Sequence, residues 1–247
     1  MRCDIFTPYI YMKILKNIFL GIKNILFPDE CVICYENLTD LNEIRTGMCL
    51  RCLLSIKYEK ENRCYICGKP LISENEICLQ CRTNENRIYE RIWMIFPYTG
   101  KYRNLLAGYK FKKNLMIINI FLLIIKEVIE NEVVLKDAVI VPVPPRPGKI
   151  KNTGWDQIEY LVRQIEKQSN IKVNRCLKRI KSKTQKQLNR NERKKNLEGR
   201  ILINGKAPET ALVIDDVITT GSTMEVCALA LKKAGTKKVY GLCLFYD

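Results

Sequence analysis

One short segment combines residue types that suit a phosphorylated sugar. In "ALVIDDVITTGSTM", residues 211–224, four apolar residues lead into Asp215 and Asp216, and a loop of small hydroxyl residues follows. Two adjacent carboxylates repel a phosphate but suit the hydroxyls of a ribose or a bound Mg²⁺. Small residues at the start of a helix suit the phosphate itself. Those residues are Thr219, Thr220, Gly221, Ser222 and Thr223. The segment therefore predicts a cradle for ribose 5-phosphate, with a helix cap without ligand as the simpler alternative.

Eight of the 12 cysteines form four Cys-x-x-Cys pairs, which is a pattern typical of metal sites. Each pair presents two thiolates to one ion, and two pairs complete the four-cysteine set of a structural zinc site. The eight residues are Cys31, Cys34, Cys49, Cys52, Cys64, Cys67, Cys78 and Cys81. The spacing allows sequential pairing of the four motifs as well as cross-braced pairing. We predict two structural Zn²⁺ sites, with an iron–sulfur cluster or disulfides as the alternatives.

The charge balance favours a polyanionic partner. The chain has 42 Lys and Arg against 26 Asp and Glu, a net charge of +16, and no histidine. Histidine bases and histidine metal ligands are therefore excluded. Residues 171–200 alone hold 12 Lys or Arg and 2 Glu, and few apolar residues. This basic excursion is expected to be exposed and mobile, and to contact nucleic-acid phosphates unless it is only a solvated surface.

The elements that would position these residues form an α/β domain. "DAVIVPVPP" at 137–145, "ALVIDD" and "KKVYGLCLFYD" at 237–247 predict buried strands, and 155–168 and 222–235 predict helices. This alternation predicts a parallel sheet covered by helices on both faces. Our predicted domains are an amphipathic N-terminal helix at 1–27, a cysteine-rich module at 28–85 and the α/β domain at 86–247.

The predicted location is the cytoplasm. The start of the chain lacks the pattern of a secretory signal, and the longest apolar run, at 115–125, is too short to span a bilayer. The segment 13–27 has apolar residues at helical spacing with lysines elsewhere. Such a helix docks on its own domain or lies on a membrane surface, so peripheral contact with the inner membrane is one option.

The segment "VIDDVITTGST" resembles the phosphoribosyl-diphosphate (PRPP) motif of type I phosphoribosyltransferases. Over about residues 20–247 the chain also resembles the ComF competence family, which joins a double zinc ribbon to such a domain. The shared motifs include "LFPDECVIC", "YKFKKN", "VPVPPRPGKIKNTGWDQ" and "TQKQLNRNERKKNLEG". The third motif departs from the usual Arg-Gly-Phe-Asn-Gln of that family, because residues 153–157 read Thr-Gly-Trp-Asp-Gln.

The resemblance implies roles for individual residues. The paired acids would bind the ribose hydroxyls, the hydroxyl turn would bind the 5′-phosphate, and Arg146 and Lys149 would face the diphosphate with its Mg²⁺. The basic excursion would be the loop that closes over the site. Its Lys186, Arg190 and Arg193 are catalytic candidates by location. The predicted DNA contacts are Lys178, Arg179, Lys181, Lys183, Arg193, Lys194 and Lys195.

Two functions follow as hypotheses. The first is a phosphoribosyl-binding competence factor that handles single-stranded DNA and works with DNA-uptake proteins. The second is an active phosphoribosyltransferase that transfers the ribosyl group from PRPP to an acceptor that the sequence does not identify. An amidophosphoribosyltransferase would need an N-terminal glutaminase domain with a terminal cysteine, but Cys3 is not next to Met1 and cysteine pairs occupy 31–81.

Overall fold

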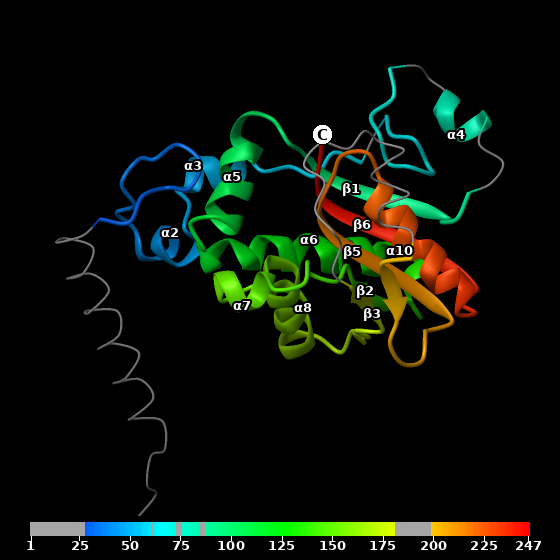
Figure 1. Cartoon of the computed structure of the whole chain (residues 1–247). Helices are drawn as coiled ribbons and strands as arrows, with labels where there is room; N and C mark the ends of the chain where they lie inside the picture. The colour runs from blue at the N-terminus through cyan, green and yellow to red at the C-terminus, as the bar shows by residue number, and fades with distance from the viewer. Residues whose placement is uncertain (1–27, 61, 73–75, 84–86, 181–198) are drawn as a thin grey trace, which may run out of the picture. The chain divides into compact units, whose positions relative to one another are not determined.

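The computed structural model describes residues 28–60, 62–72, 76–83, 87–180 and 199–247 (Figure 1). The described residues form two compact units, divided within the chain at Lys57/Tyr58, Thr99/Gly100 and Asn119/Ile120, with the described residues up to Lys57 and Gly100–Asn119 in the first unit. The predicted cysteine-rich module, 28–85, therefore contributes to both units. The predicted N-terminal helix at 1–27 lies outside the described residues.

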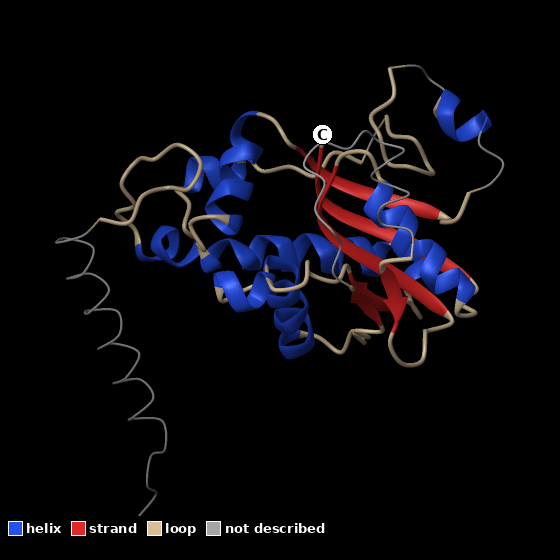
Figure 2. Ribbon diagram, viewed as in Figure 1, coloured by secondary structure: helices blue, strands red, loops and turns tan. Residues whose placement is uncertain are grey.

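A four-stranded parallel sheet forms the centre of the second unit, as predicted (Figure 2). Its strands are β1 (Arg91–Pro97), β2 (Val139–Pro142), β5 (Thr210–Ile218) and β6 (Lys238–Tyr246), in the order β1-β6-β5-β2. All three neighbouring pairs run parallel. The carboxyl ends of the strands therefore meet at one edge, where loops into helices form ligand sites in α/β folds.

Helices cover the sheet because its strands are apolar on both sides. In Figure 1, α10 (Ser222–Lys233) lies in front of β5 and β6, and α6 (Ile118–Asn131) passes behind them. Met224 and Cys227 of α10 join Val213 and Cys243 in one buried apolar cluster. The amphipathic α8 (Gln157–Gln168) buries Ile158, Leu161, Val162 and Ile165 and packs against β2 and β5.

The remaining elements of the second unit are short. They are α4 (Leu79–Thr83), η2 (Val133–Leu135), α7 (Lys149–Thr153), β3 (Leu177–Arg179) and β4 (Ile201–Ile203). Strands β3 and β4 pair antiparallel, and the Ile180 amide donates to the Arg200 carbonyl oxygen at 2.9 Å. The two ends of the basic excursion are thus held together, while its residues 181–198 lie outside the described residues.

The first unit surrounds four of the cysteines with short helices. These are α2 (Leu41–Thr46), α3 (Leu50–Leu54), α5 (Gly100–Lys110) and the 3₁₀ turn η1 (Leu115–Ile117). Gly108 permits close packing of α5, because a Cβ atom at this position would lie 2.0 Å from Cγ2 of Val32. The Asn104 side chain of α5 donates to the Ile33 carbonyl oxygen at 3.0 Å.

Candidate functional site

The Asp-Asp segment lies where the sequence predicts it, at the carboxyl end of β5. Asp215 and Asp216 belong to the strand, and the loop of residues 219–221 leads into α10. Gly221 caps α10 with φ +78°, a left-handed conformation that favours glycine. The hydroxyls of Thr220 and Ser222 lie 2.9 Å apart. The amides at the start of a helix and hydroxyls of this kind are hydrogen-bond donors, which is the chemistry of an anion site.

The loop after β2 lies beside this segment. Strand β2 pairs with β5, and the Val143 amide donates to the Ile214 carbonyl oxygen at 3.0 Å. The two loops predicted to bind the two ends of PRPP therefore leave neighbouring strands at the same edge of the sheet. This placement rests on the strand order and could not be read from either motif alone.

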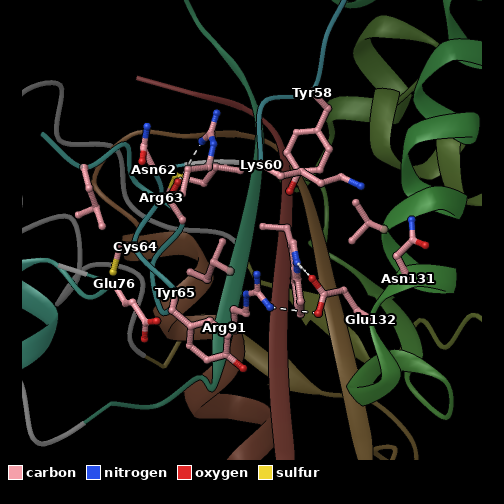
Figure 3. Close-up of a pocket in the computed structure, with 16 residues that line it drawn as sticks. Tyr58, Lys60, Asn62, Arg63, Cys64, Tyr65, Glu76, Arg91, Asn131 and Glu132 are labelled. Carbon is pink, nitrogen blue, oxygen red and sulfur yellow. Dashed lines mark hydrogen bonds and ion pairs between the residues drawn. The ribbon is translucent and has the colours of Figure 1, made fainter. Parts of the chain in front are cut away.

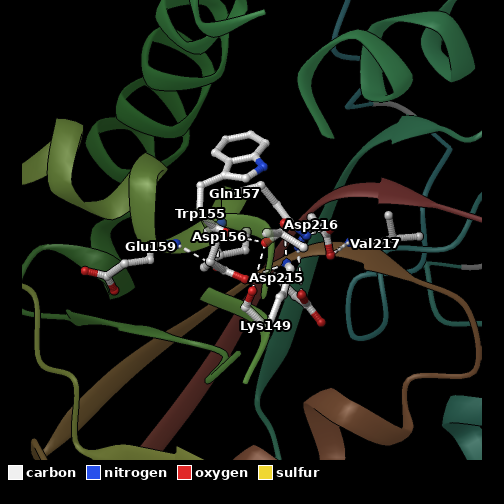
Figure 4. Close-up of polar contacts among 10 residues, drawn as sticks. Lys149, Trp155, Asp156, Gln157, Glu159, Asp215, Asp216 and Val217 are labelled. Carbon is white, nitrogen blue, oxygen red and sulfur yellow. Dashed lines mark hydrogen bonds and ion pairs between the residues drawn. The ribbon is translucent and has the colours of Figure 1, made fainter. Parts of the chain in front are cut away.

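A chain of polar contacts connects Asp216 of β5 with the segment that follows β2 (Figure 4). The Gln157 amide donates to Oδ2 of Asp216 at 2.5 Å, and both residues are buried. Lys149 donates to Gln157 and, at 2.6 Å, to Oδ2 of Asp156. The other oxygen of Asp156 caps α8 by accepting from the amides of Ile158 and Glu159, both at 3.0 Å. The network fixes the orientation of one carboxylate of the Asp-Asp pair.

Asp156 and Gln157 were not among the predicted site residues, although both stand in the quoted motif. An acid before Gln157 has a structural explanation here, because it caps α8 and pairs with Lys149. The side chain of Lys149 is 27% exposed, so its ammonium group lies at the border between the network and solvent. Gln157 therefore links Lys149 to Asp216. The contact of Lys149 with diphosphate stays a prediction.

Arg179 is the basic residue whose electrostatic surroundings include two other arginines and Asp215. Burial lowers the pKa of the Arg179 guanidinium, Arg146 and Arg200 lower it further, and Asp215 opposes the shift. Arg179 belongs to β3, while Arg200 lies directly before β4 and Arg146 in the loop after β2. Asp215 thus contributes to the electrostatic surroundings of Arg179 at the end of β3. Arg200 was missed in the sequence, where nothing distinguished it from the other basic residues of the excursion.

The other predicted basic residues divide into two groups. Lys178 is an exposed residue of β3. The rest lie outside the described residues, so their roles in catalysis or DNA binding stay predictions. They are Lys181, Lys183, Lys186, Arg190, Arg193, Lys194 and Lys195.

The cysteines form two tetrads with sequential pairing. Within each tetrad the four sulfur atoms lie within 4.8 Å of one another. The first tetrad is Cys31, Cys34, Cys49 and Cys52, and the second is Cys64, Cys67, Cys78 and Cys81. The second tetrad belongs to the unit that contains the sheet, and the first belongs to the other unit.

The sulfur geometry fits zinc and excludes disulfides. Sγ of Cys34 lies 3.7 Å from Sγ of Cys49, and Sγ of Cys67 lies 3.7 Å from Sγ of Cys78. A tetrahedral ion with Zn–S distances of about 2.3 Å separates its sulfurs by about 3.8 Å, whereas a disulfide needs about 2.05 Å. All eight cysteines are free thiols and buried or half-buried. Two closed four-cysteine sets of this kind fit two structural zinc sites.

Comparisons with known proteins agree with this arrangement. A family model of the double zinc ribbon domain matches residues 22–82. "Competence protein F" of Haemophilus influenzae is 25% identical over 86% of this chain and 95% of that protein. "Competence protein ComFC" of Bacillus subtilis is 24% identical over 76% of this chain and 79% of that protein. The protein of the same name from Streptococcus pneumoniae is 24% identical over 85% of this chain and 92% of that protein.

The chain is similar to the ComF competence proteins. The similarity extends well beyond the cysteine tetrads into the α/β unit, so the resemblance predicted from the motifs is confirmed. The double zinc ribbon and the ComF-like α/β unit thus occur in one chain, as in the predicted fold class. Among the described residues, none of the helices combines the length and the apolar character needed to cross a bilayer.

Proposed function

We propose that this ComF-like chain binds PRPP, or a related phosphoribosyl group, and assists natural competence by handling single-stranded DNA. The observation that carries the ligand half is the strand–loop–helix segment from Asp215 to Thr223, with both loops at one sheet edge. The names of the three relatives support the competence half. DNA-uptake proteins would then be its partners.

In this proposal the two carboxylates hold the ribose hydroxyls. Gln157 restrains Asp216, and such preorganisation lowers the entropy lost on binding. Thr219, Thr220, Gly221, Ser222 and Thr223 would hold the 5′-phosphate through backbone amides and hydroxyls. Mg²⁺ would accompany the diphosphate and offset its charge. Arg146, Lys149 and the nearby Arg179 and Arg200 would supply the remaining positive charge.

DNA binding would come from the basic excursion and its described ends, Lys178 and Arg179. Contacts of lysine and arginine with phosphates release counterions, so the affinity falls steeply as salt rises. The same segment lies between β3 and β4, and Asp215 acts electrostatically on Arg179 at the end of β3. Binding of PRPP would therefore change the charge that the excursion faces, and so tune the affinity for DNA.

An active phosphoribosyltransferase is the second candidate. The basic residues at the predicted diphosphate end, Arg146 and Lys149, favour it, because departing diphosphate needs positive charge for electrostatic stabilisation. The catalytic candidates Lys186, Arg190 and Arg193 would add to that charge if the excursion closed over the site. Release of diphosphate from PRPP in the presence of candidate acceptor bases would support this function.

Calorimetry of the zinc-loaded chain tests the proposal. PRPP with Mg²⁺ is titrated with and without single-stranded oligonucleotide in the same buffer, for the wild type and for the Asp215→Asn, Asp216→Asn double variant. We expect binding by the wild type, a change of affinity when DNA is present, and loss of PRPP binding in the variant. Equal heats for both proteins, or no heat for either, would overturn the phosphoribosyl half. DNA affinity that does not change between low and moderate salt would overturn the DNA half.

A further inference from the structure

A cavity of about 540 Å³ lies along the edge strand β1, away from the predicted PRPP residues. Its walls come from the second cysteine tetrad and the segment before it, from β1 and from the end of α6 (Figure 3). Its volume is in the range of small-molecule and cofactor sites. The lining includes three aromatic and three basic residues, together with two glutamates, Glu76 and Glu132. The aromatic and basic residues are Tyr58, Lys60, Arg63, Tyr65, Arg91 and Trp93.

The central feature of the cavity is a stack of three side chains. The guanidinium carbon of Arg91 lies 4.4 Å from the ring centroid of Tyr65 and 4.7 Å from the Trp93 ring. Glu132 fixes Arg91 and Trp93, because it accepts hydrogen bonds from Arg91 at 3.1 Å and from the indole N–H of Trp93 at 3.0 Å. The two ends of the stack differ greatly in exposure, with Trp93 3% and Tyr65 54% exposed. The exposed Tyr65 ring is therefore held in place by Arg91, which in turn stacks on the buried Trp93.

An exposed ring held in this way is a platform for a nucleobase. Base–aromatic stacking is tolerant of sequence, because every base has a π-face. The cation on the inner side of Tyr65 restrains the ring, so stacking costs less side-chain entropy than it would on a freely rotating tyrosine. Asn131, labelled at the far side of the cavity in Figure 3, adds an amide of the kind that pairs with base edges.

The three basic residues of the cavity differ in mobility: Lys60 is exposed and can change its partner, whereas hydrogen bonds fix Arg63 and Arg91. Lys60 pairs with Glu127 at 2.7 Å, but the two side chains are 48% and 50% exposed. Exposed pairs of this kind contribute little, so the ammonium group can exchange its partner for a phosphate. Arg63 donates to two carbonyl oxygens and to the Tyr246 hydroxyl, and Arg91 is held by Glu132. These two arginines shape the wall, and Arg63 has no carboxylate among these partners.

We infer that this cavity binds single-stranded DNA, with one base on Tyr65 and the adjacent phosphate near Lys60. The inference rests on the DNA half of the proposed function and assigns a second contact, separate from the basic excursion.

The test is fluorescence anisotropy of a short labelled oligothymidylate with the zinc-loaded chain. Tyr65→Ala is expected to weaken binding roughly 5- to 150-fold, the range for loss of one base–aromatic stack. Tyr65→Phe keeps the ring and should bind like the wild type. Ile72→Ala is the matched control, since Ile72 is fully exposed in the same ribbon and does not line the cavity. Zinc content and the thermal midpoint show that each variant is folded.

Photo-cross-linking of an iododeoxyuridine oligonucleotide to Tyr65 or Tyr58, mapped by mass spectrometry, would support the inference independently. Wild-type affinity in Tyr65→Ala would overturn the inference and leave the DNA half of the proposed function standing. No oligonucleotide binding by the wild type would overturn both. Competition with free thymidine monophosphate shows whether the cavity binds DNA or a free nucleotide. Displacement only at far higher nucleotide concentration supports DNA as the ligand, and displacement at equal concentration overturns it.

Discussion

The two cysteine tetrads have the same ligands but different surroundings. The first packs among short helices, with Asn104 bonded to Ile33 and Gly108 against Val32. The second is attached to a β-sheet, where the Ile92 amide of β1 donates to the Ile66 carbonyl oxygen at 2.7 Å. Beside it, a Cβ atom on Gly68 would lie 2.5 Å from the Ile92 carbonyl oxygen. One tetrad therefore organises a helical unit, and the other is built onto the edge of the α/β unit.

This difference gives the second zinc site a specific structural task. Strand β1 is at the edge of the sheet, and an open edge exposes unpaired backbone groups that promote aggregation. The knuckle around Ile66 and Gly68 pairs with and covers part of that edge. Because metal binding and folding are coupled in small zinc modules, loss of the second zinc should uncover β1, while loss of the first should not.

The largest expected effect comes from removing one ligand of each tetrad in turn. Structural zinc contributes on the order of 10 kcal/mol in small zinc modules. Cys67→Ser should therefore lose zinc and release the Ile92 amide to exchange, whereas Cys34→Ser should lose zinc and leave that amide protected. Hydrogen exchange read by mass spectrometry over the peptide that contains Ile92 makes the comparison. Equal deprotection in both variants would show that the tetrads do not have separate tasks.

Glycine-to-alanine substitutions provide the second comparison. Gly68 has φ +71° and faces backbone, so Gly68→Ala should cost about 2–4 kcal/mol through strain and overlap. A Cβ atom at Gly108 would meet side chains only, chiefly Val32 and more distantly Ile117. Gly108→Ala also gains about 1 kcal/mol of helix propensity, so its cost should be smaller. Denaturant unfolding measures both. Val32→Ala should rescue Gly108→Ala, and failure of that rescue would contradict the assigned contact.

The smallest of the three effects concerns the polar contacts that hold each ribbon. Arg63 donates to the carbonyl oxygens of Glu59 and Gly68 at 2.7 and 3.0 Å and to the Tyr246 hydroxyl at 3.1 Å. Arg63→Ala should cost about 1–3 kcal/mol, and Asn104→Ala about 1 kcal/mol, because only one neutral hydrogen bond is lost there. Arg63→Lys should not restore stability, since an ammonium group lacks the planar fork. Thermal unfolding that ranks Asn104→Ala above Arg63→Ala would reverse the comparison.

The elements with strong local signals could be predicted. Residues 211–216 are apolar and β-branched before the aspartates, and they form most of β5. The helix predicted at 155–168 is α8, which begins at Gln157 because Asp156 caps it. Strands β3 and β4 have only three residues each, and their pairing depends on residues more than 20 positions apart. Such short, non-local strands leave no periodic pattern in the sequence.

The candidate site could be predicted only in part, for the same reason. The Asp-Asp segment and the cysteine ligands are local motifs whose residue types indicate their chemistry. The bond between Gln157 and Asp216 joins residues 59 positions apart, and the cavity beside Tyr65 needs the ribbon, β1 and α6 together. Sequential and cross-braced pairing use the same four motifs, so only the distances between sulfurs distinguish them.

Cadmium NMR tests the separation of the two tetrads most directly. With ¹¹³Cd in place of zinc, we predict two signals from four-thiolate sites. Cys34→Ser and Cys49→Ser should both perturb one signal, and Cys64→Ser and Cys78→Ser should both perturb the other. If Cys34→Ser and Cys64→Ser perturbed the same signal, the pairing would be cross-braced and the assignment of one zinc site to each unit would be wrong.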